Sequence, residues 1–119
     1  MPVRRPRKPE PPRYELVQGQ PQPQPDLAAW KSWQAAAGDA LIVQETDYRG
    51  MHVSTFFTGV DDLPRLRPGP PKLYRTQVSG GRGNGLVLAS ATAGEARQAH
   101  GRMLAVLRKY YADDPPPQG

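Results

Sequence analysis

Met51-His-Val-Ser-Thr-Phe-Phe-Thr-Gly59 is the stretch that decides the fold. Its side chains alternate with a period of two, and it is rich in β-branched and aromatic residues, which is the signature of a β-strand. One face would carry Met51, Val53, Thr55 and Phe57, and the other His52, Ser54, Phe56 and Thr58. Because both faces carry a phenylalanine, we expect a central strand whose second face is covered at least in part.

Three neighbouring segments have a similar composition and predict further strands at residues 40–47, 72–79 and 85–91. Asp47-Tyr-Arg-Gly50 is an ordinary hairpin connection between the first strand and the second. The strand at 72–79 mixes apolar residues with Arg75 and Gln77. Such mixed polarity is typical of a half-exposed or edge strand.

Two helices flank the predicted strands. Asp26 is a helix N-cap and Gly38 a stop signal, which predicts a helix over residues 26–37. Its stripe of Leu27, Trp30, Trp33 and Ala37 favours packing on the sheet over a ligand platform. Thr92-Ala-Gly-Glu95 is a capping box that starts a second helix, which we expect to reach residue 112.

These elements predict an α+β fold: an N-terminal helix, a four-stranded and mainly antiparallel sheet, and a C-terminal helix packed on the sheet, with extended Pro-rich ends. Residues 26–112 would form a single body, and residues 113–119 a disordered tail. Residues 1–25 contain eight prolines and predict an extended, basic, partly polyproline II arm. We expect that removal of this arm leaves the melting temperature nearly unchanged, because Tyr14, Leu16 and Val17 are its main apolar residues.

The composition narrows the class of protein. The chain has 119 residues, no cysteine and a formal net charge of +5. We therefore expect no disulfide framework and no thiolate metal site. No apolar run is long enough for a membrane span, and no apolar segment follows the basic start, so we expect neither a membrane partner nor a signal peptide. The expected location is the cytoplasm of a host cell, or a virion assembled there.

The positive charge gathers near the start of the chain, where five basic side chains face two acidic ones in residues 1–25. Further arginines occur in two predicted loops. The candidate partner-binding residues are Arg4, Arg5, Arg7, Lys8, Arg13, Arg65, Arg67 and Arg82. A basic arm favours an anionic partner such as DNA or RNA, and it is equally consistent with a solvated tail. Arginine is also common in protein–protein interfaces.

Candidate catalytic residues are few, and none has a specific motif around it. Ser79-Gly-Gly-Arg-Gly-Asn-Gly85 lacks the ending of a phosphate-binding loop and predicts a flexible hairpin turn. His52 and His100 have no metal-ligand spacing, and we expect both to be packing residues. Asp61 and Asp62 could bind a divalent ion, although adjacent carboxylates are common in loops. We predict no cofactor, no metal and no catalytic residue.

One pattern runs through much of the chain. It consists of Ser54-Thr-Phe-Phe-Thr-Gly-Val-Asp61, Gly69-Pro-Pro71, Leu73-Tyr74, Thr76, Val78, Gly80-Gly81, Thr92-Ala-Gly-Glu-Ala96, His100 and Met103. Over roughly residues 40–107 it resembles a group of small uncharacterised proteins encoded by bacteriophages and prophages, often of actinobacteria. Most of that group have a Gly-Leu-Asp-His step and an acidic residue in the third strand. Here Asp62 replaces the histidine and Arg75 the acid. The resemblance implies a phage or mobile-element origin and no particular activity.

Three hypotheses of function follow. The first is a non-enzymatic interaction protein of a phage or mobile element that binds a host or phage protein, as an inhibitor of a host defence complex or a minor virion component. The second is a basic, sequence-tolerant nucleic-acid-binding protein. The third is an enzyme or metal protein that uses His52, Asp61 and Asp62. We favour the first, because the chain is small and lacks a recognisable catalytic set.

Overall fold

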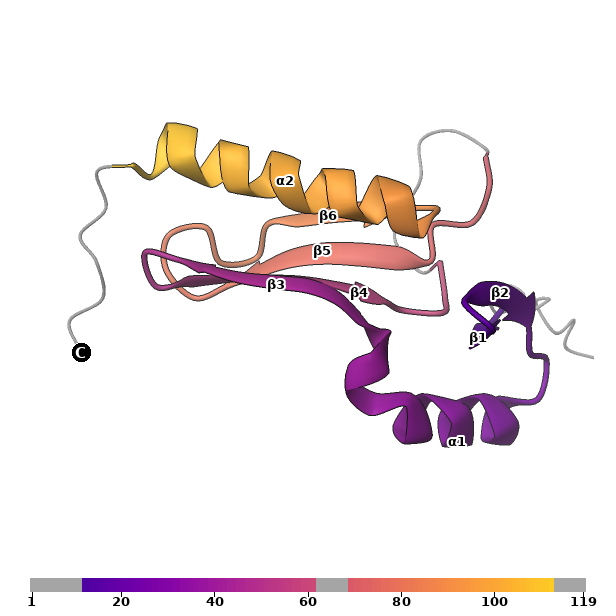
Figure 1. Ribbon diagram of the computed structural model, residues 1–119. Helices are drawn as coiled ribbons and strands as arrows, with labels where there is room; N and C mark the ends of the chain where they lie inside the picture. The colour runs from indigo at the N-terminus through magenta and orange to yellow at the C-terminus, as the bar shows by residue number, and fades with distance from the viewer. Residues whose placement is uncertain (1–11, 62–68, 113–119) are drawn as a thin grey trace, which may run out of the picture.

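The computed structural model describes residues 12–61 and 69–112 of the protein. The described chain is built from six strands, two α-helices and one short 3-10 helix (Figure 1). In chain order these are β1 (Tyr14–Val17), β2 (Gln20–Pro23), α1 (Leu27–Ala37), the 3-10 helix η1 (Gly38–Leu41), β3 (Ile42–Tyr48), β4 (Met51–Phe57), β5 (Tyr74–Ser79), β6 (Val87–Ser90) and α2 (Ala93–Tyr110).

The larger sheet has the strand order β3-β4-β5-β6, and every neighbouring pair is antiparallel. The predictions of an α+β fold, of a four-stranded antiparallel sheet and of a central position for β4 are confirmed. Of the two alternatives for the strand at 72–79, the edge position is wrong, because β5 is also central, and the half-exposed strand is what the structure shows. Its polar residues Arg75 and Gln77 point to the face without a helix, so mixed polarity here marks a strand covered on one face only.

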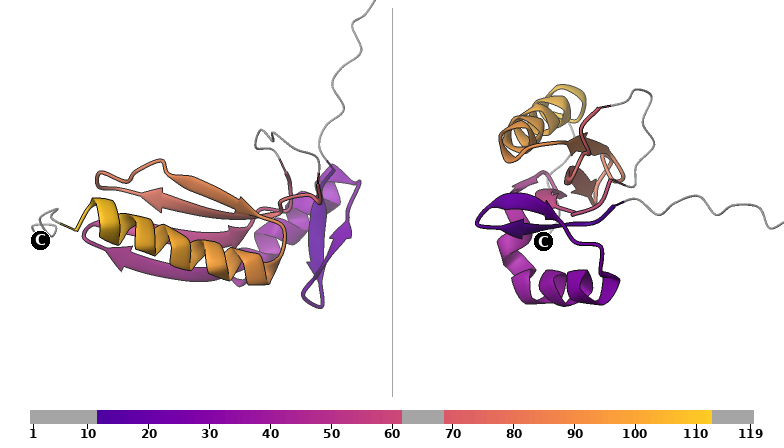
Figure 2. Two further views of the ribbon diagram at one scale, coloured as in Figure 1. Left: turned by 90° about the horizontal axis from the view of Figure 1, so that it is seen from above. Right: turned by 90° about the vertical axis from the view of Figure 1, so that its right-hand side faces the viewer.

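Helix α2 lies along one face of this sheet (Figures 1 and 2) and contacts all four of its strands. The start signal that predicted this helix is present with one change: Glu95 N–H donates to the hydroxyl of the N-cap Thr92 at 3.1 Å, while the Glu95 carboxylate accepts at 3.2 Å from the N–H of Ala91, the residue before the cap. The helix buries the face of β4 that was predicted from the alternation. Its own buried residues are Ala96, Ala99, His100, Met103 and Leu107.

The core between α2 and the sheet consists of two apolar clusters. One contains Met51, Val53, Val78, Met103 and Leu107, and the other Phe57, Leu73, Tyr74 and Ala96. A chain of hydrogen-bonded polar side chains, buried except for the half-buried Thr46, links α2 to three of the strands. Thr55 bonds both to His100 Nδ1 at 2.8 Å and to the Thr76 hydroxyl at 2.7 Å, and His100 Nε2 bonds to the Thr46 hydroxyl at 2.9 Å. These bonds satisfy the polar side chains that α2 covers.

The Gly-rich connection between β5 and β6 joins two antiparallel strands as a hairpin, as predicted. Gly80 N–H donates to the Asn84 side chain at 2.8 Å, and Gly83 N–H donates to the Met51 sulfur at 3.3 Å. Gly83 is buried, and a Cβ atom there would lie 2.9 Å from the Met51 sulfur and 3.0 Å from Leu107. The glycine is therefore explained by close packing on the core, without a bound phosphate.

Residues 14–23 do not form the extended arm that we expected. They fold into a hairpin, in which β1 and β2 make a separate two-stranded antiparallel sheet. Each strand of this hairpin pairs on one side only. Prolines are tolerated here because a residue on the unpaired side needs no backbone N–H donor. Residues 1–11, 62–68 and 113–119 lie outside the described residues, and so do the predictions made for them.

The hairpin is attached to the rest of the molecule by specific bonds. Tyr14 N–H donates to Gly59 carbonyl oxygen at 2.7 Å, and the Trp30 indole N–H donates to Tyr14 carbonyl oxygen at 2.9 Å. Tyr14 and Leu16 also pack against the cluster that contains Phe57. The fit is close, because a Cβ atom at Gly59 would lie 2.6 Å from the Tyr14 oxygen. Residues 13–23 thus pack on the folded body and do not extend away from it as an arm.

Helix α1 differs from the prediction in its place. Asp26 caps it as expected, accepting from Ala28 and Ala29 N–H at 2.9 and 3.2 Å. The helix lies beyond one end of the sheet and packs on β1 and η1 instead of covering the sheet (Figure 1). Trp30 is the buried residue of this helix, and the half-buried Trp33 packs against the second core cluster, with its ring edge-on to Phe57 at 5.9 Å between centroids. A short helix with two tryptophans can therefore be held by a hairpin as well as by a sheet.

Phe57 and Phe56 offer a matched test of this arrangement. Phe57 is 2% exposed and makes edge contacts with Trp33 and Tyr74. Phe57→Ala should lower the free energy of unfolding by about 3–5 kcal/mol, because it leaves a cavity in the core. Phe56→Ala, on the opposite face, should cost about 1 kcal/mol. Urea unfolding of both variants measures the difference, and equal losses would contradict the assignment of the two faces.

The role of the hairpin can be tested by truncation. Deleting residues 1–25 removes the Tyr14 bonds and the packing of Leu16, so the melting temperature should fall by at least about 4–8 °C, the shift that corresponds to 1 kcal/mol in a domain of this size. Deleting residues 1–11 retains every contact described above and is the control. If the two truncated proteins melt at the same temperature, the hairpin does not stabilise the body.

Candidate functional site

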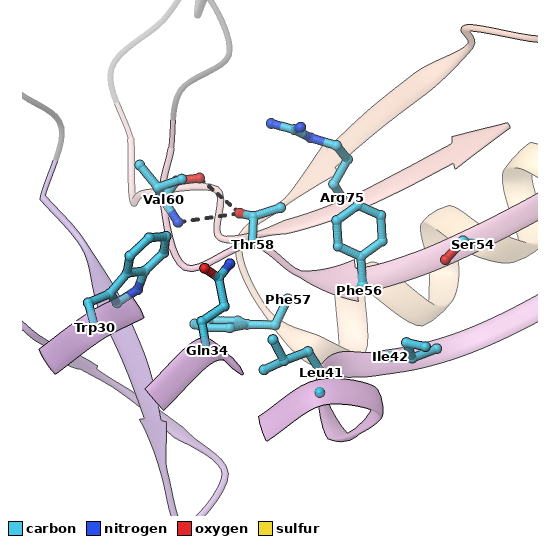
Figure 3. A pocket seen from close by; sticks show the side chains of 11 residues that line it. Trp30, Gln34, Leu41, Ile42, Ser54, Phe56, Phe57, Thr58, Val60 and Arg75 are labelled. Carbon is cyan, nitrogen blue, oxygen red and sulfur yellow. Dashed lines mark hydrogen bonds between the residues drawn. The ribbon is translucent and has the colours of Figure 1, made fainter. Parts of the chain in front are cut away.

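The described elements leave the face of the sheet opposite α2 uncovered, and this face carries a groove of about 440 Å³ where it meets α1 (Figure 3). Side chains from α1, η1 and three neighbouring strands line it. These residues are Trp30, Gln34, Gly38, Leu41, Ile42, Ser54, Phe56, Phe57, Thr58, Val60 and Arg75. A groove of this size is within the range of binding sites for small molecules and for a few peptide side chains.

The strand alternation places the groove residues. Met51, Val53, Thr55 and Phe57 point toward α2, so Ser54 and Phe56 must point to the opposite face. Register then fixes their neighbours: Phe56 is paired with Ile42 of β3 on one side and with Arg75 of β5 on the other. Directly opposed residues on antiparallel strands share a face. The apolar side chains of Phe56 and Ile42 therefore lie beside Arg75 on the face of the sheet opposite α2.

Thr58, which follows β4, is held by the fold itself. Its hydroxyl lies 2.8 Å from Val60 carbonyl oxygen and 2.9 Å from Leu73 carbonyl oxygen, and both bonds are made within the chain. On the other side, Trp30 and Gln34 of α1 form a wall that faces this strand end (Figure 3). The Trp30 ring is fixed by its bond to Tyr14, so the hairpin positions one wall of the groove.

The chemistry of the groove is that of recognition. Aromatic and aliphatic side chains dominate, Gln34 and Ser54 add polar groups, and Arg75 is the one charged residue among the described lining residues. Ser54 has no histidine or carboxylate beside it within this lining, so no activated nucleophile is assembled here. A binding partner would meet apolar surface next to one cation.

The predicted basic residues are not brought together where the structure describes them. Arg13 pairs with Val60 in an isolated bridge, and its guanidinium lies 5.8 Å from the centroid of the Trp30 ring, beside the groove. Arg82 lies in the turn between β5 and β6 and stacks on Tyr111 at 5.4 Å. Arg4, Arg5, Arg7, Lys8, Arg65 and Arg67 lie outside the described residues.

His52 lies on the open face, in an acidic cluster at the start of β4. Its Nδ1 lies 2.7 Å from Asp47 and its Nε2 lies 3.3 Å from Glu45. The hydrogen bond to Asp47, followed by that to Glu45, raises the pKa of His52 above its usual value of 6.5. We expected a packing residue here, and the structure gives a half-exposed histidine with two carboxylate partners.

The remaining candidates for a metal or catalytic site do not converge. Asp61 lies beyond the far end of β4 from His52, a separation on the order of 20 Å along the strand. Its carboxylate accepts from Lys72 N–H at 3.0 Å. In residues 12–61 and 69–112 no group of three histidine or acidic side chains has an arrangement that could hold a metal ion. Asp62 lies outside the described residues.

His100 is the buried packing residue that the sequence predicted. Burial lowers its pKa below 6.5, so the ring stays neutral near pH 7. A neutral imidazole has one N–H donor and one acceptor nitrogen, and the hydroxyls of Thr46 and Thr55 satisfy both. It lies on the opposite side of the sheet from the groove and is structural.

Comparison of this chain with protein-family models, with curated proteins and with solved structures gave no match. Among the described helices, none is long and apolar enough to cross a membrane. Any inference about the function of the groove therefore rests on the geometry and chemistry of its own residues.

The two histidines predict opposite effects of pH on stability. As the pH falls below 6.5, the unfolded chain protonates at His100 before the folded protein does, so His100 destabilises the fold in acid. His52 has a raised pKa, so it stabilises the fold below 6.5 and this contribution is lost as the pH rises through its folded-state pKa. Solvent screening makes the effect of the half-exposed His52 the smaller one.

Urea midpoints measured from pH 8 to pH 5 test this assignment. His100→Gln should reduce the loss of stability in acid relative to the unmodified protein, and His52→Asn should increase it. The assignment of the two roles fails if the two substitutions change the slope in the same direction.

Proposed function

We propose that the protein is a non-enzymatic interaction protein, and that the groove between α1 and the open sheet face binds an extended segment of a partner protein. The observation that carries this proposal is the pairing of Phe56 with Ile42 on one side and Arg75 on the other, on a sheet face that the described elements leave uncovered. Aromatic residues and arginine are the side chains that contribute most to protein–protein binding.

The composition of the groove favours one kind of ligand. Phe56, Leu41 and Ile42 offer an apolar surface for an aliphatic or aromatic anchor. Arg75 can form a paired hydrogen bond with a carboxylate next to that anchor. The groove is bounded by fixed elements, since η1 runs directly into β3 and the hairpin holds Trp30. The expected ligand is an extended peptide with an apolar residue followed or preceded by an acidic one.

A phage or mobile-element origin, suggested by the resemblance in residues 40–107, extends the proposal to the partner. The partner would then be a host or phage protein complex, with the protein acting in the host cytoplasm or in the virion. Support for a binding role comes from the apolar side chains that lie beside Arg75 in the lining of the described groove.

Selection of peptides from a yeast-displayed random library tests the proposal. Peptides that bind should be enriched in an apolar residue next to Asp or Glu. The dissociation constant of a selected peptide, measured by fluorescence polarisation, should rise about tenfold or more with Arg75→Glu and with Phe56→Lys. Gln77→Glu is the control, because it places a carboxylate on β5, on the same face, outside the groove.

Two outcomes would overturn the proposal. In the first, selected peptides bind Arg75→Glu and Gln77→Glu with equal affinity. In the second, no peptide is selected, while DNA or RNA binds with an affinity that falls steeply with salt, which is the behaviour of the alternative nucleic-acid-binding protein.

A further inference from the structure

The two edges of the four-stranded sheet differ in how well they are protected. Edge strands expose unpaired backbone groups, and proteins usually protect them with charges, prolines or bulges. The β3 edge has such protection: Glu45 and Asp47 lie on it, and its register shifts at a bulge between Ile42 and Gln44. The β6 edge has the sequence Val87-Leu-Ala-Ser90, with no charge, no proline and no register shift across its four residues.

The register shows which backbone groups of β6 point outward. Val78 N–H donates to Leu86 carbonyl oxygen at 3.0 Å, and hydrogen-bonded pairs alternate along an antiparallel ladder. Leu88, two residues further along, therefore bonds inward to Thr76, while the N–H and C=O groups of Val87 and Ala89 point away from β5. As far as the described residues are concerned, no strand pairs with this outer edge.

The side chains along this edge are apolar and exposed. Leu86, Val87 and Leu88 are 36%, 43% and 37% exposed. Because β6 carries no charged side chain, two copies of it can pair without placing like charges opposite each other. The same strand would have no electrostatic preference for the acidic or basic segment of another protein.

We propose that the outer edge of β6 pairs, antiparallel, with β6 of a second copy of this chain, with Leu88 at the two-fold axis. Centring the pair on Leu88 places Val87 opposite Ala89 of the partner subunit, and Ala89 opposite the partner's Val87. These are the residues whose backbone groups point outward, so each of the two opposed pairs exchanges both of its hydrogen bonds. Leu88 meets the partner's Leu88 in a non-hydrogen-bonded pair, where opposed side chains are closest.

The pairing produces one continuous sheet with a two-fold axis perpendicular to it. Both copies of α2 then lie on one face, and both grooves lie open on the other face. The dimer would present two copies of the groove to one partner assembly, which can raise binding strength through avidity without any new contact. The pairing itself is independent of the proposed function, because β6 contributes no residue to the groove.

The absence of cysteine allows a direct test of the register. In a non-hydrogen-bonded antiparallel pair the Cα atoms are about 4.5 Å apart, which is within the range for a disulfide. Leu88→Cys should therefore form an intermolecular disulfide under mild oxidation, seen as a dimer on a non-reducing gel. Val17→Cys, at an exposed valine of the hairpin, is the control for random collisions and should cross-link far more slowly.

Sedimentation equilibrium of the full chain provides the second measurement. The unmodified protein should show twice the 13.1 kDa mass of one chain at high concentration. Leu88→Lys places two like charges opposite each other and should raise the dimer dissociation constant about tenfold or more, whereas Val17→Lys should leave it unchanged. The proposal is overturned if the protein remains monomeric at all concentrations, or if it dimerises and neither Leu88 variant behaves differently from its Val17 control.

Discussion

The fold depends on a largely buried hydrogen-bonded chain in which His100 of α2 joins Thr46 of β3 and Thr55 of β4, and Thr55 joins Thr76 of β5. A polar group buried without a partner costs about 1–3 kcal/mol, so these four side chains are favourable only in the registers that bring them together. These hydrogen-bonded side chains lie between the two apolar clusters of the core. They therefore specify where the helix rests on the sheet, while the clusters supply most of the stabilisation.

Fixing α2 on one face leaves the other face of the same strands open. Because side chains alternate, the residues that seal the core and the residues of the groove come from one short stretch, residues 51–58. The groove is completed from a distant part of the chain, where the hairpin holds Trp30 through the Tyr14 carbonyl oxygen. Its shape should therefore be rigid, which lowers the entropic cost of binding an extended ligand.

Local signals predicted much of the fold. The alternation of β4, the Asp26 cap and the Thr92 cap each depend on residues close in sequence, and each is present. Three features depend on distant contacts and were missed: the central place of β5, the hairpin at residues 14–23, and α1 packing on that hairpin. The groove was missed for the same reason. Phe56 was correctly placed on the second face of β4, but its neighbours Ile42 and Arg75 follow from register, which the sequence alone does not fix.

The central claim is that α2 seals one face of the sheet and leaves the other open, and hydroxyl-radical footprinting tests it most directly. Phe56 and Phe57 are adjacent and chemically identical, so their oxidation rates report the environment of each ring. The structure predicts that the half-buried Phe56 is oxidised faster than Phe57, and that Met51 and Met103, which are 0% and 3% exposed, are oxidised slowly. Equal rates for the two phenylalanines, or rapid oxidation of either methionine, would contradict the account.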